Sequence, residues 1–229
     1  MGVHASRLKD YVYVHLHDHE TSEVLLLRAD APLSPPLCVA PRKQGVQYSL
    51  TEGETVFFIL TNKDNAKDFK IMCAPVQNPT EEHWQEFIPH QEGRLILSQE
   101  AYKDYLVWTE RENGLPRLII KNRSSSEEHL IHFEEEAYAI GFLGAHEYYT
   151  DTFRFSYSSP RTPEKIFAYN MKDNSRKLLK TQEIPSGHRE EDYCVKRLMV
   201  KAEDGESIPV TLYWHKETPL DGTAPCLLY

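Results

Sequence analysis

The chain has 229 residues, of which 40% are hydrophobic and 11% aromatic, and this content predicts an ordered chain with one large domain or two small ones. Its 26 basic and 35 acidic residues give a formal net charge of −9, which argues against a nucleic-acid partner because phosphate binding needs a positive patch. No run approaches about 18 apolar residues, so we also expect no membrane partner.

The first residues and the cysteines bear on the cellular compartment. Residues 1–7 read Met-Gly-Val-His-Ala-Ser-Arg and contain no apolar segment of a secretory signal. The cysteines lie far apart and form no C-x-x-C pair: Cys38, Cys73, Cys194 and Cys226. Thiols spaced in this way are typical of a reducing compartment, so we expect a cytoplasmic protein, with a structural disulfide as the less favoured alternative.

Short runs rich in Val, Ile, Phe and Tyr, each bounded by Asn, Asp, Gly, Ser or Pro, predict strands over most of the chain. The predicted strands cover residues 11–16, 23–27, 55–60, 69–74, 84–88, 105–109, 118–121, 129–133, 153–157 and 166–170. No apolar stripe with the 3.6-residue helical period extends over ten or more residues before position 180. The sequence therefore predicts an all-β fold.

The spacing of the predicted strands indicates a repeat. Apolar runs that follow polar turns occur at residues 25–27, 87–88, 130–131 and 178–179, at intervals of 62, 43 and 48 residues. A four-stranded propeller blade takes roughly 40–50 residues, so the pattern favours three to four blades over a β-sandwich, which has similar short strands. A propeller closes with about four to eight blades, and we expect the chain, with about three and a half units, to be part of a larger array.

The character of the sequence changes after about residue 181. Residues 183–188 form a polar segment with Pro and Gly that we interpret as a linker. Two predicted strands, residues 195–201 and 208–214, flank Asp204 and Gly205, which is a strong hairpin signal. Residues 226–229 begin a further apolar run, from which we expect a continuation of the fold.

Residues 178–229 resemble the junction between propeller and hydrolase in the prolyl oligopeptidase family, and most closely its oligopeptidase B branch. The matching patterns are E-I-P-S-G-H at residues 183–188, D-G-x-x-I-P-V-x-L from Asp204 to Leu212, and P-x-L-L-Y at residues 225–229. Upstream, residues 153–180 resemble the last propeller blade of that family, and residues 12–27 resemble a hairpin of a middle blade.

The resemblance implies a seven-bladed propeller that caps an α/β-hydrolase domain with a Ser-Asp-His triad, short peptide substrates, and cleavage after Arg or Lys. Residues 1–187 would then belong to the propeller, and residues 188–229 would start the hydrolase domain. The remaining blades and the rest of the hydrolase domain are the expected partners. No cofactor is implied.

No catalytic residue is assigned within this chain. A nucleophile elbow needs G-x-S-x-G, and the ten glycines form no such pattern. In the family all three triad residues lie beyond the point that matches Tyr229. We therefore expect the isolated chain to have no peptidase activity and to serve in gating and substrate filtering.

One group of histidines has the spacing of a metal site. His15, His17 and His19 alternate and would share one face of a continuous strand, with Asp18 and Glu20 nearby. We favour a hairpin turn at His19, which would break the shared face. The sequence therefore predicts no metal site here.

Three other polar groups were candidates for function. His83 and Glu86 do not form the H-E-x-x-H arrangement. The run Glu134, Glu135 and Glu136 favours a solvated loop, with attraction of cationic peptides as the alternative. Residues 124–126, all serine, are interpreted as a turn.

The alternative function is a stand-alone or degenerate, non-catalytic β-repeat interaction module, with a metal-binding protein as a third and more distant reading.

Overall fold

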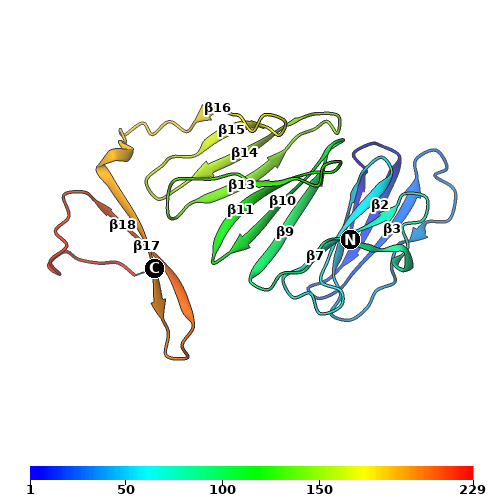
Figure 1. Cartoon of the computed structure of the whole chain (residues 1–229), viewed down its shortest axis with the longest axis horizontal. Helices are drawn as coiled ribbons and strands as arrows, with labels where there is room; N and C mark the ends of the chain where they lie inside the picture. Colours follow the sequence, from blue (N-terminus) through cyan, green and yellow to red (C-terminus); the bar gives the residue numbers. More distant parts are fainter. Residues whose placement is uncertain (229) are drawn as a thin grey trace. The chain divides into compact units, whose positions relative to one another are not determined.

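The computed structural model describes residues 1–228, which form four sheets of four strands followed by a two-stranded hairpin (Figure 1). The apolar run predicted at residues 226–229 lies partly outside the described residues. Within each sheet, strands that follow one another in the chain are hydrogen-bonded neighbours. The all-β prediction is confirmed: the helical residues in the described part are two 3₁₀ turns, η1 (Glu81–His83) and η2 (Glu190–Asp192).

The strand bounds follow a regular repeat. The first sheet holds β1 (Gly2–Ala5), β2 (Tyr11–His17), β3 (Ser22–Arg28) and β4 (Leu37–Cys38). The second holds β5 (Tyr48–Glu52), β6 (Val56–Thr61), β7 (Lys70–Pro75) and β8 (Gln85–Ile88). The third holds β9 (Arg94–Ala101), β10 (Tyr105–Glu112), β11 (Leu115–Asn122) and β12 (Glu128–Leu130). The fourth holds β13 (Ala139–Gly144), β14 (Thr152–Ser158), β15 (Lys165–Asn170) and β16 (Arg176–Thr181), and the hairpin is β17 (Tyr193–Lys201) and β18 (Ser207–His215).

The repeat length was predicted correctly, and the number of units agrees with the prediction of three to four blades. Four complete four-stranded sheets are present, slightly more than the three and a half units counted from the intervals. The apolar runs at residues 87–88, 130–131 and 178–179 do mark the last strands of sheets, whereas residues 25–27 lie in β3, the third strand of its sheet. That misplaced marker produced the long first interval of 62 residues.

Six strands have no counterpart among the ranges predicted from the sequence: β1, β4, β5, β9, β13 and β16. β5 does alternate apolar and polar residues, but over five residues only, and the other strands lack a sustained apolar alternation. β1 is mostly exposed, β4 has two residues, β5 carries Ser and Thr between its apolar residues, and β13 contains two glycines. These strands form because neighbouring strands offer hydrogen-bonding partners, which a local sequence window does not reveal.

The described residues divide into two compact units. Unit 1 comprises residues 1–131, 144–153 and 170–175, and unit 2 comprises residues 132–143, 154–169 and 176–229. In unit 1, β6 supplies both faces of the second sheet: Phe57 belongs to one buried apolar cluster, with Tyr13 and Val24, and its neighbour Phe58 belongs to another, with Trp108 and Leu106. Successive residues of a strand point to opposite faces, so β6 joins two layers of core between sheets.

Unit 2 contains little buried surface. Aromatic rings line part of it: Phe133 stacks on Tyr157 at 4.9 Å between ring centroids, and Phe155 stacks on Phe167 at 5.4 Å. The hairpin β17–β18 pairs from Tyr193 with His215 to Lys201 with Ser207, which confirms the hairpin predicted at Asp204 and Gly205. None of the residues of β16, β17 and β18 is buried.

Candidate functional site

Loops from different sheets of unit 1 meet at the side chain of Arg7, in the β1–β2 loop. Its Nη1 donates to the Ala101 carbonyl oxygen at 2.9 Å, its Nη2 donates to the Ala145 carbonyl oxygen and pairs with the Glu100 carboxylate, and the guanidinium lies over the Tyr102 ring at 4.8 Å. Ala101 ends β9, and Ala145 directly follows β13. One side chain of the first sheet therefore fastens the ends of strands in two later sheets.

This contact indicates how the sheets of unit 1 are arranged. Arg7 and Ala145 are 138 positions apart, with the second and third sheets between them in the sequence. In a flat row of sheets they would be separated by two sheet layers, each about 10 Å thick. Their contact within unit 1 shows that the loops holding these residues do not follow one another in a flat row.

The same network includes the second sheet. The Leu8 amide donates to Glu52 Oε2 at 2.9 Å, and the buried Glu52 ends β5. Glu54 lies in the loop after β5, and its Oε1 accepts a hydrogen bond from the Tyr149 hydroxyl at 2.7 Å. Arg123 Nη1 donates to the Tyr148 hydroxyl at 2.9 Å. We call these residues the loop network: Arg7, Leu8, Glu52, Glu54, Glu100, Arg123, Tyr148 and Tyr149.

Burial is the main cause of the pKa shifts of two carboxylates of the loop network, Glu100 and Glu52. It raises the pKa of Glu100, and the Arg7 charge and the Ala145 amide offset only part of this effect. Burial also raises the pKa of Glu52 more than its hydrogen bonds from Leu8 and Ser6 lower it. Gly144 is needed beside Glu100 because its φ is +63° and an added Cβ atom would overlap the Glu100 carboxylate.

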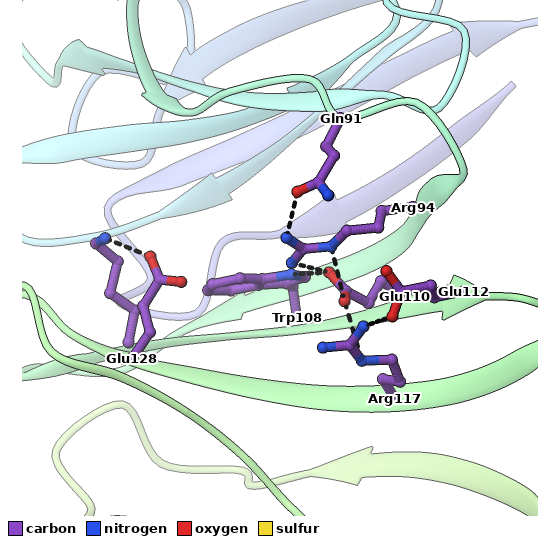
Figure 2. Close-up of polar contacts among 8 residues, drawn as sticks. Gln91, Arg94, Trp108, Glu110, Glu112, Arg117 and Glu128 are labelled. Atoms are coloured by element: carbon purple, nitrogen blue, oxygen red, sulfur yellow. Dashed lines mark hydrogen bonds and ion pairs between the residues drawn. The ribbon is translucent and has the colours of Figure 1, made fainter.

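A second polar group lies in the third sheet around Glu110, whose side chain is 1% exposed (Figure 2). It accepts hydrogen bonds from Arg94 Nη2 at 2.9 Å and from Trp108 Nε1 at 2.9 Å, and Arg117 Nε lies 3.3 Å from its other oxygen. Arg117 also pairs with Glu112. Two arginines and two glutamates balance, so the group has no excess charge for a ligand and instead fixes the register of β9, β10 and β11.

The acidic run in unit 2 differs from the prediction. Glu134 and Glu136 are exposed, but Glu135 is half-buried and accepts hydrogen bonds from Thr162 Oγ1 at 2.7 Å and Tyr157 Oη at 3.1 Å. The interpretation of this run as a solvated loop is therefore wrong for Glu135. A local sequence window cannot distinguish three identical side chains when their hydrogen-bonding partners lie more than twenty residues away.

The predicted histidine group is divided by the β2–β3 turn, as expected. His19 lies in that turn, where its carbonyl oxygen accepts from Gln47 Nε2 at 2.6 Å. His15 stacks on His4 at 5.0 Å, and burial, with the neighbouring His4 and His17, lowers the pKa of His15. His15 and His17 line a cleft of about 500 Å³ in unit 1. Over residues 1–228, no three His, Cys, Asp or Glu side chains are placed to hold a metal ion.

The other candidates have local structural roles. His83 lies in η1 and Glu86 in β8, and the His83 ring contacts Asn78 and Thr80. The three serines at residues 124–126 form a turn, in which the Asn122 side chain accepts from the amides of Ser124 and Ser125. The interpretation of residues 124–126 as a turn is confirmed. All four cysteines are free thiols.

The sequence analysis missed the residues that organise the loop network and the Glu110 group, although Glu110 leaves a signal in the sequence. Leu106, Trp108 and Glu110 alternate along β10, so the two-residue period places Glu110 on a face with two fully buried side chains. An acidic residue on an apolar face predicts a buried partner of opposite charge. Arg7 and Glu100 leave no such signal because their partners are distant in the sequence.

Four consecutive four-stranded antiparallel sheets, each built from strands that follow one another in the chain, define this chain as a β-propeller segment. The model of the N-terminal β-propeller domain of prolyl oligopeptidase matches residues 1–182, and the chain belongs to this family of S9 serine peptidases. No helix in the described part of the chain has the length and apolar character to cross a bilayer.

Individual members of this and related peptidase groups are also similar to the chain. The chain is 32% identical over 233 residues to dipeptidyl aminopeptidase BI of Pseudoxanthomonas mexicana, covering 100% of this chain and 31% of that protein. It is 24% identical to protease 2 of Moraxella lacunata, covering 96% of this chain and 31% of the relative. The structure of oligopeptidase B from Leishmania major superposes with a TM-score of 0.87 and 26% identity, covering 96% of this chain and 32% of that one. The chain thus spans about a third of the length of these proteins.

Proposed function

We propose that the chain is the propeller portion of a serine oligopeptidase that cleaves short peptides after Arg or Lys. In this proposal residues 1–187 belong to a seven-bladed propeller, residues 188–229 start the α/β-hydrolase domain, and the Ser-Asp-His triad lies outside the chain. The family assignment and the similarity to oligopeptidase B support the reaction class. In that chemistry a histidine activates the serine, and hydrogen-bond donors stabilise the oxyanion.

The role of this portion is to filter substrates by size. The observation that carries the proposal is the loop network, in which Arg7 joins strand ends of three sheets. In a closed propeller, loops that meet where first strands end would narrow the opening around the propeller axis. A flexible peptide would pass such an opening, whereas a folded domain would not.

Charge supports a preference for basic peptides. Unit 1 contains 15 basic and 22 acidic residues, and unit 2 contains 11 and 13. Most of the negative charge therefore belongs to unit 1, where it would raise the local concentration of cationic peptides. The four free thiols support a reducing compartment such as the cytoplasm.

Two measurements test the proposal. The coding sequence beyond Tyr229 should encode G-x-S-x-G followed by an aspartate and a histidine, in that order. The protein made from the whole reading frame should hydrolyse a fluorogenic Arg dipeptide, with loss of activity on treatment with a serine-directed inhibitor. Residues 1–229 alone should give no turnover. Inhibitor-sensitive turnover by residues 1–229 would show that the nucleophile lies within this chain.

A size series tests filtering separately from catalysis. The longer protein should cleave an Arg-containing peptide of about ten residues but not the same sequence placed within a folded domain. Equal cleavage of the two substrates would remove the filtering role and leave the peptidase assignment intact. A stop codon at the end of this chain would instead favour the β-repeat interaction module.

A further inference from the structure

The segment that joins the fourth sheet to the hairpin is attached at several points within unit 2. After β16, the Gln182 amide donates to the Glu164 carbonyl oxygen at 2.8 Å. Residues 183–187 form a turn closed by a hydrogen bond from the Gly187 amide to the Ile184 carbonyl oxygen at 3.0 Å. The chain then returns to the sheet at His188. The segment interpreted from sequence as a linker is thus held on both sides of this short turn.

Two side chains attach the second part of the segment. His188 Nε2 donates to the Arg161 carbonyl oxygen at 2.6 Å, and the His188 ring stacks on Tyr193 at 5.2 Å between ring centroids. Glu190, in η2, pairs with Lys165 Nζ at 2.7 Å. Both attachment points, Arg161 and Lys165, belong to the β14–β15 connection or its immediate end.

Glu135 holds that connection in place. Its carboxylate accepts from Thr162 Oγ1 at 2.7 Å, from Arg161 Nε at 3.1 Å and from Tyr157 Oη at 3.1 Å. The connection is also closed by its own hydrogen bond, from the Ser159 amide to the Thr162 carbonyl oxygen at 3.0 Å. The same residue, Arg161, thus binds Glu135 through its side chain and His188 through its backbone.

The neighbouring glutamate extends the attachment into the hairpin. Glu136 Oε2 accepts from the Arg197 amide at 2.8 Å, near the middle of β17. Glu135 therefore contacts the β14–β15 connection, which binds the segment before η2 through Arg161 and His188, whereas Glu136 contacts β17, which follows η2. Glu134, by contrast, is exposed and makes no hydrogen bond or ion pair within the described part of the chain.

We propose that Glu135 is a positioning residue, which holds residues 157–165 so that they fix residues 182–192 on the fourth sheet and set the direction in which β17 leaves it. The segment would then act as a clamped joint rather than as a flexible linker. This inference goes beyond the proposed peptidase function, because it concerns contacts within this chain and can be tested without catalysis.

The three consecutive glutamates provide a matched comparison. Glu135→Gln keeps the shape of the side chain but replaces one acceptor oxygen with an amide group that faces hydrogen-bond donors. Glu134→Gln makes the same chemical change one residue away at an exposed position. Arg189 lies between His188 and Glu190 and is exposed, so trypsin cleavage after Arg189 reports the detachment of the segment.

The experiment uses residues 1–229 of the protein and follows cleavage after Arg189 by mass spectrometry, together with amide hydrogen exchange of residues 182–192 and of β9–β12. We expect Glu135→Gln to increase both the cleavage rate and the exchange of the segment about tenfold, with β9–β12 unchanged. Glu134→Gln should stay within about twofold of the unmodified chain. Equal rates for the two variants would overturn the proposal.

A second variant covers the case in which Glu135→Gln unfolds unit 2. Tyr157→Phe removes one of the hydroxyl donors to Glu135 and keeps the ring that stacks on Phe133. It should increase cleavage after Arg189 by a few fold without changing the exchange of β14. An increase in β14 exchange with no selective change at residues 182–192 would show that Glu135 only stabilises the sheet.

Discussion

The first three sheets and the strands β16–β18 are both antiparallel, but different interactions hold them. In the first three sheets, side chains such as Phe57, Ile71 and Trp108 are fully buried in the clusters between sheets. In β16–β18 no residue is buried, and polar contacts attach β17 and the preceding η2 to the rest of unit 2, namely the hydrogen bond of Glu136 to β17 and the ion pair of Glu190 with Lys165. Where apolar burial does not fix an element, polar contacts have to determine its position.

The same contrast appears in two carboxylates that each face an arginine. Glu100 pairs with Arg7 in unit 1, and Glu135 pairs with Arg161 in unit 2. Burial raises the pKa of Glu100 because its partners do not offset the loss of water. Burial also acts to raise the pKa of Glu135, but the hydrogen bonds from Ser159, Thr162, Arg161 and Tyr157 outweigh it and the pKa is lowered.

The pKa shifts of Glu100 and Glu135 differ in direction because the two carboxylates have different hydrogen-bond donors, while the charge of the arginine partner is the same. One arginine is present in each pair, yet three hydroxyl groups accompany it only at Glu135. Hydrogen bonds to the ionised form favour that form, whereas burial disfavours it. The Glu100–Arg7 pair thus lies in a packed region that tolerates a desolvated charge. At Glu135, by contrast, the hydrogen bonds themselves stabilise the attachment of the neighbouring segment.

The largest expected effect is in the buried region. Glu110→Ala leaves Arg94 and Arg117 without their shared partner next to Trp108, and we expect a loss of about 3–5 kcal/mol in the free energy of unfolding. The measurement is urea denaturation followed by circular dichroism. A loss that large would show that the packed sheets also depend on one polar group.

Glu112→Ala is the control for this substitution. Glu112 is partly exposed and pairs with the same Arg117, so its removal should cost less than about 1 kcal/mol. Similar losses for the two variants would mean that burial of Glu110 adds nothing to its interaction with the arginines.

A smaller effect is expected at Gly144, where the loop network approaches the backbone closely. Gly144→Ala places a methyl group against the Glu100 carboxylate at a residue with a φ of +63°, and we expect a loss of about 2 kcal/mol in the free energy of unfolding. Gly93→Ala changes a residue with a φ of +82° that has open space around it and should cost about 1 kcal/mol. If both variants lose the same amount, the contact with Glu100 is not a constraint.

Local patterns in the sequence predict much of this fold. β2, β6, β10 and β14 were found because their apolar residues alternate or run together between turn residues, and the hairpin β17–β18 was found from Asp204 and Gly205. The repeat length followed from the last strands of three sheets. The strands β1 and β13 were missed because their residues are mostly exposed or include glycine, so they depend on pairing with β2 and β14.

The candidate site was much less predictable. Arg7 reaches Ala145 across 138 positions, and no feature within a short window indicates that contact. Glu134, Glu135 and Glu136 are identical in type, and only the folding of residues 157–162 next to them separates one from the others. Specific polar contacts between distant segments depend on the assembled fold, whereas strand and turn preferences are local.

The smallest expected effect is a pair of opposite pH dependences that tests the comparison between Glu100 and Glu135. The pKa of Glu135 is lowered by folding, so its ionisation contributes stability above its unfolded pKa, and this contribution is lost as the pH falls through the folded pKa. The pKa of Glu100 is raised, so its ionisation costs stability as the pH rises through the folded pKa. Between about pH 4 and about pH 7, the stability of the unmodified chain should therefore rise relative to Glu135→Gln and fall relative to Glu100→Gln, each by less than about 1 kcal/mol. Urea midpoints for the three proteins across this range give the two differences, and slopes of the same sign would show that hydrogen-bond donors do not distinguish the two sites.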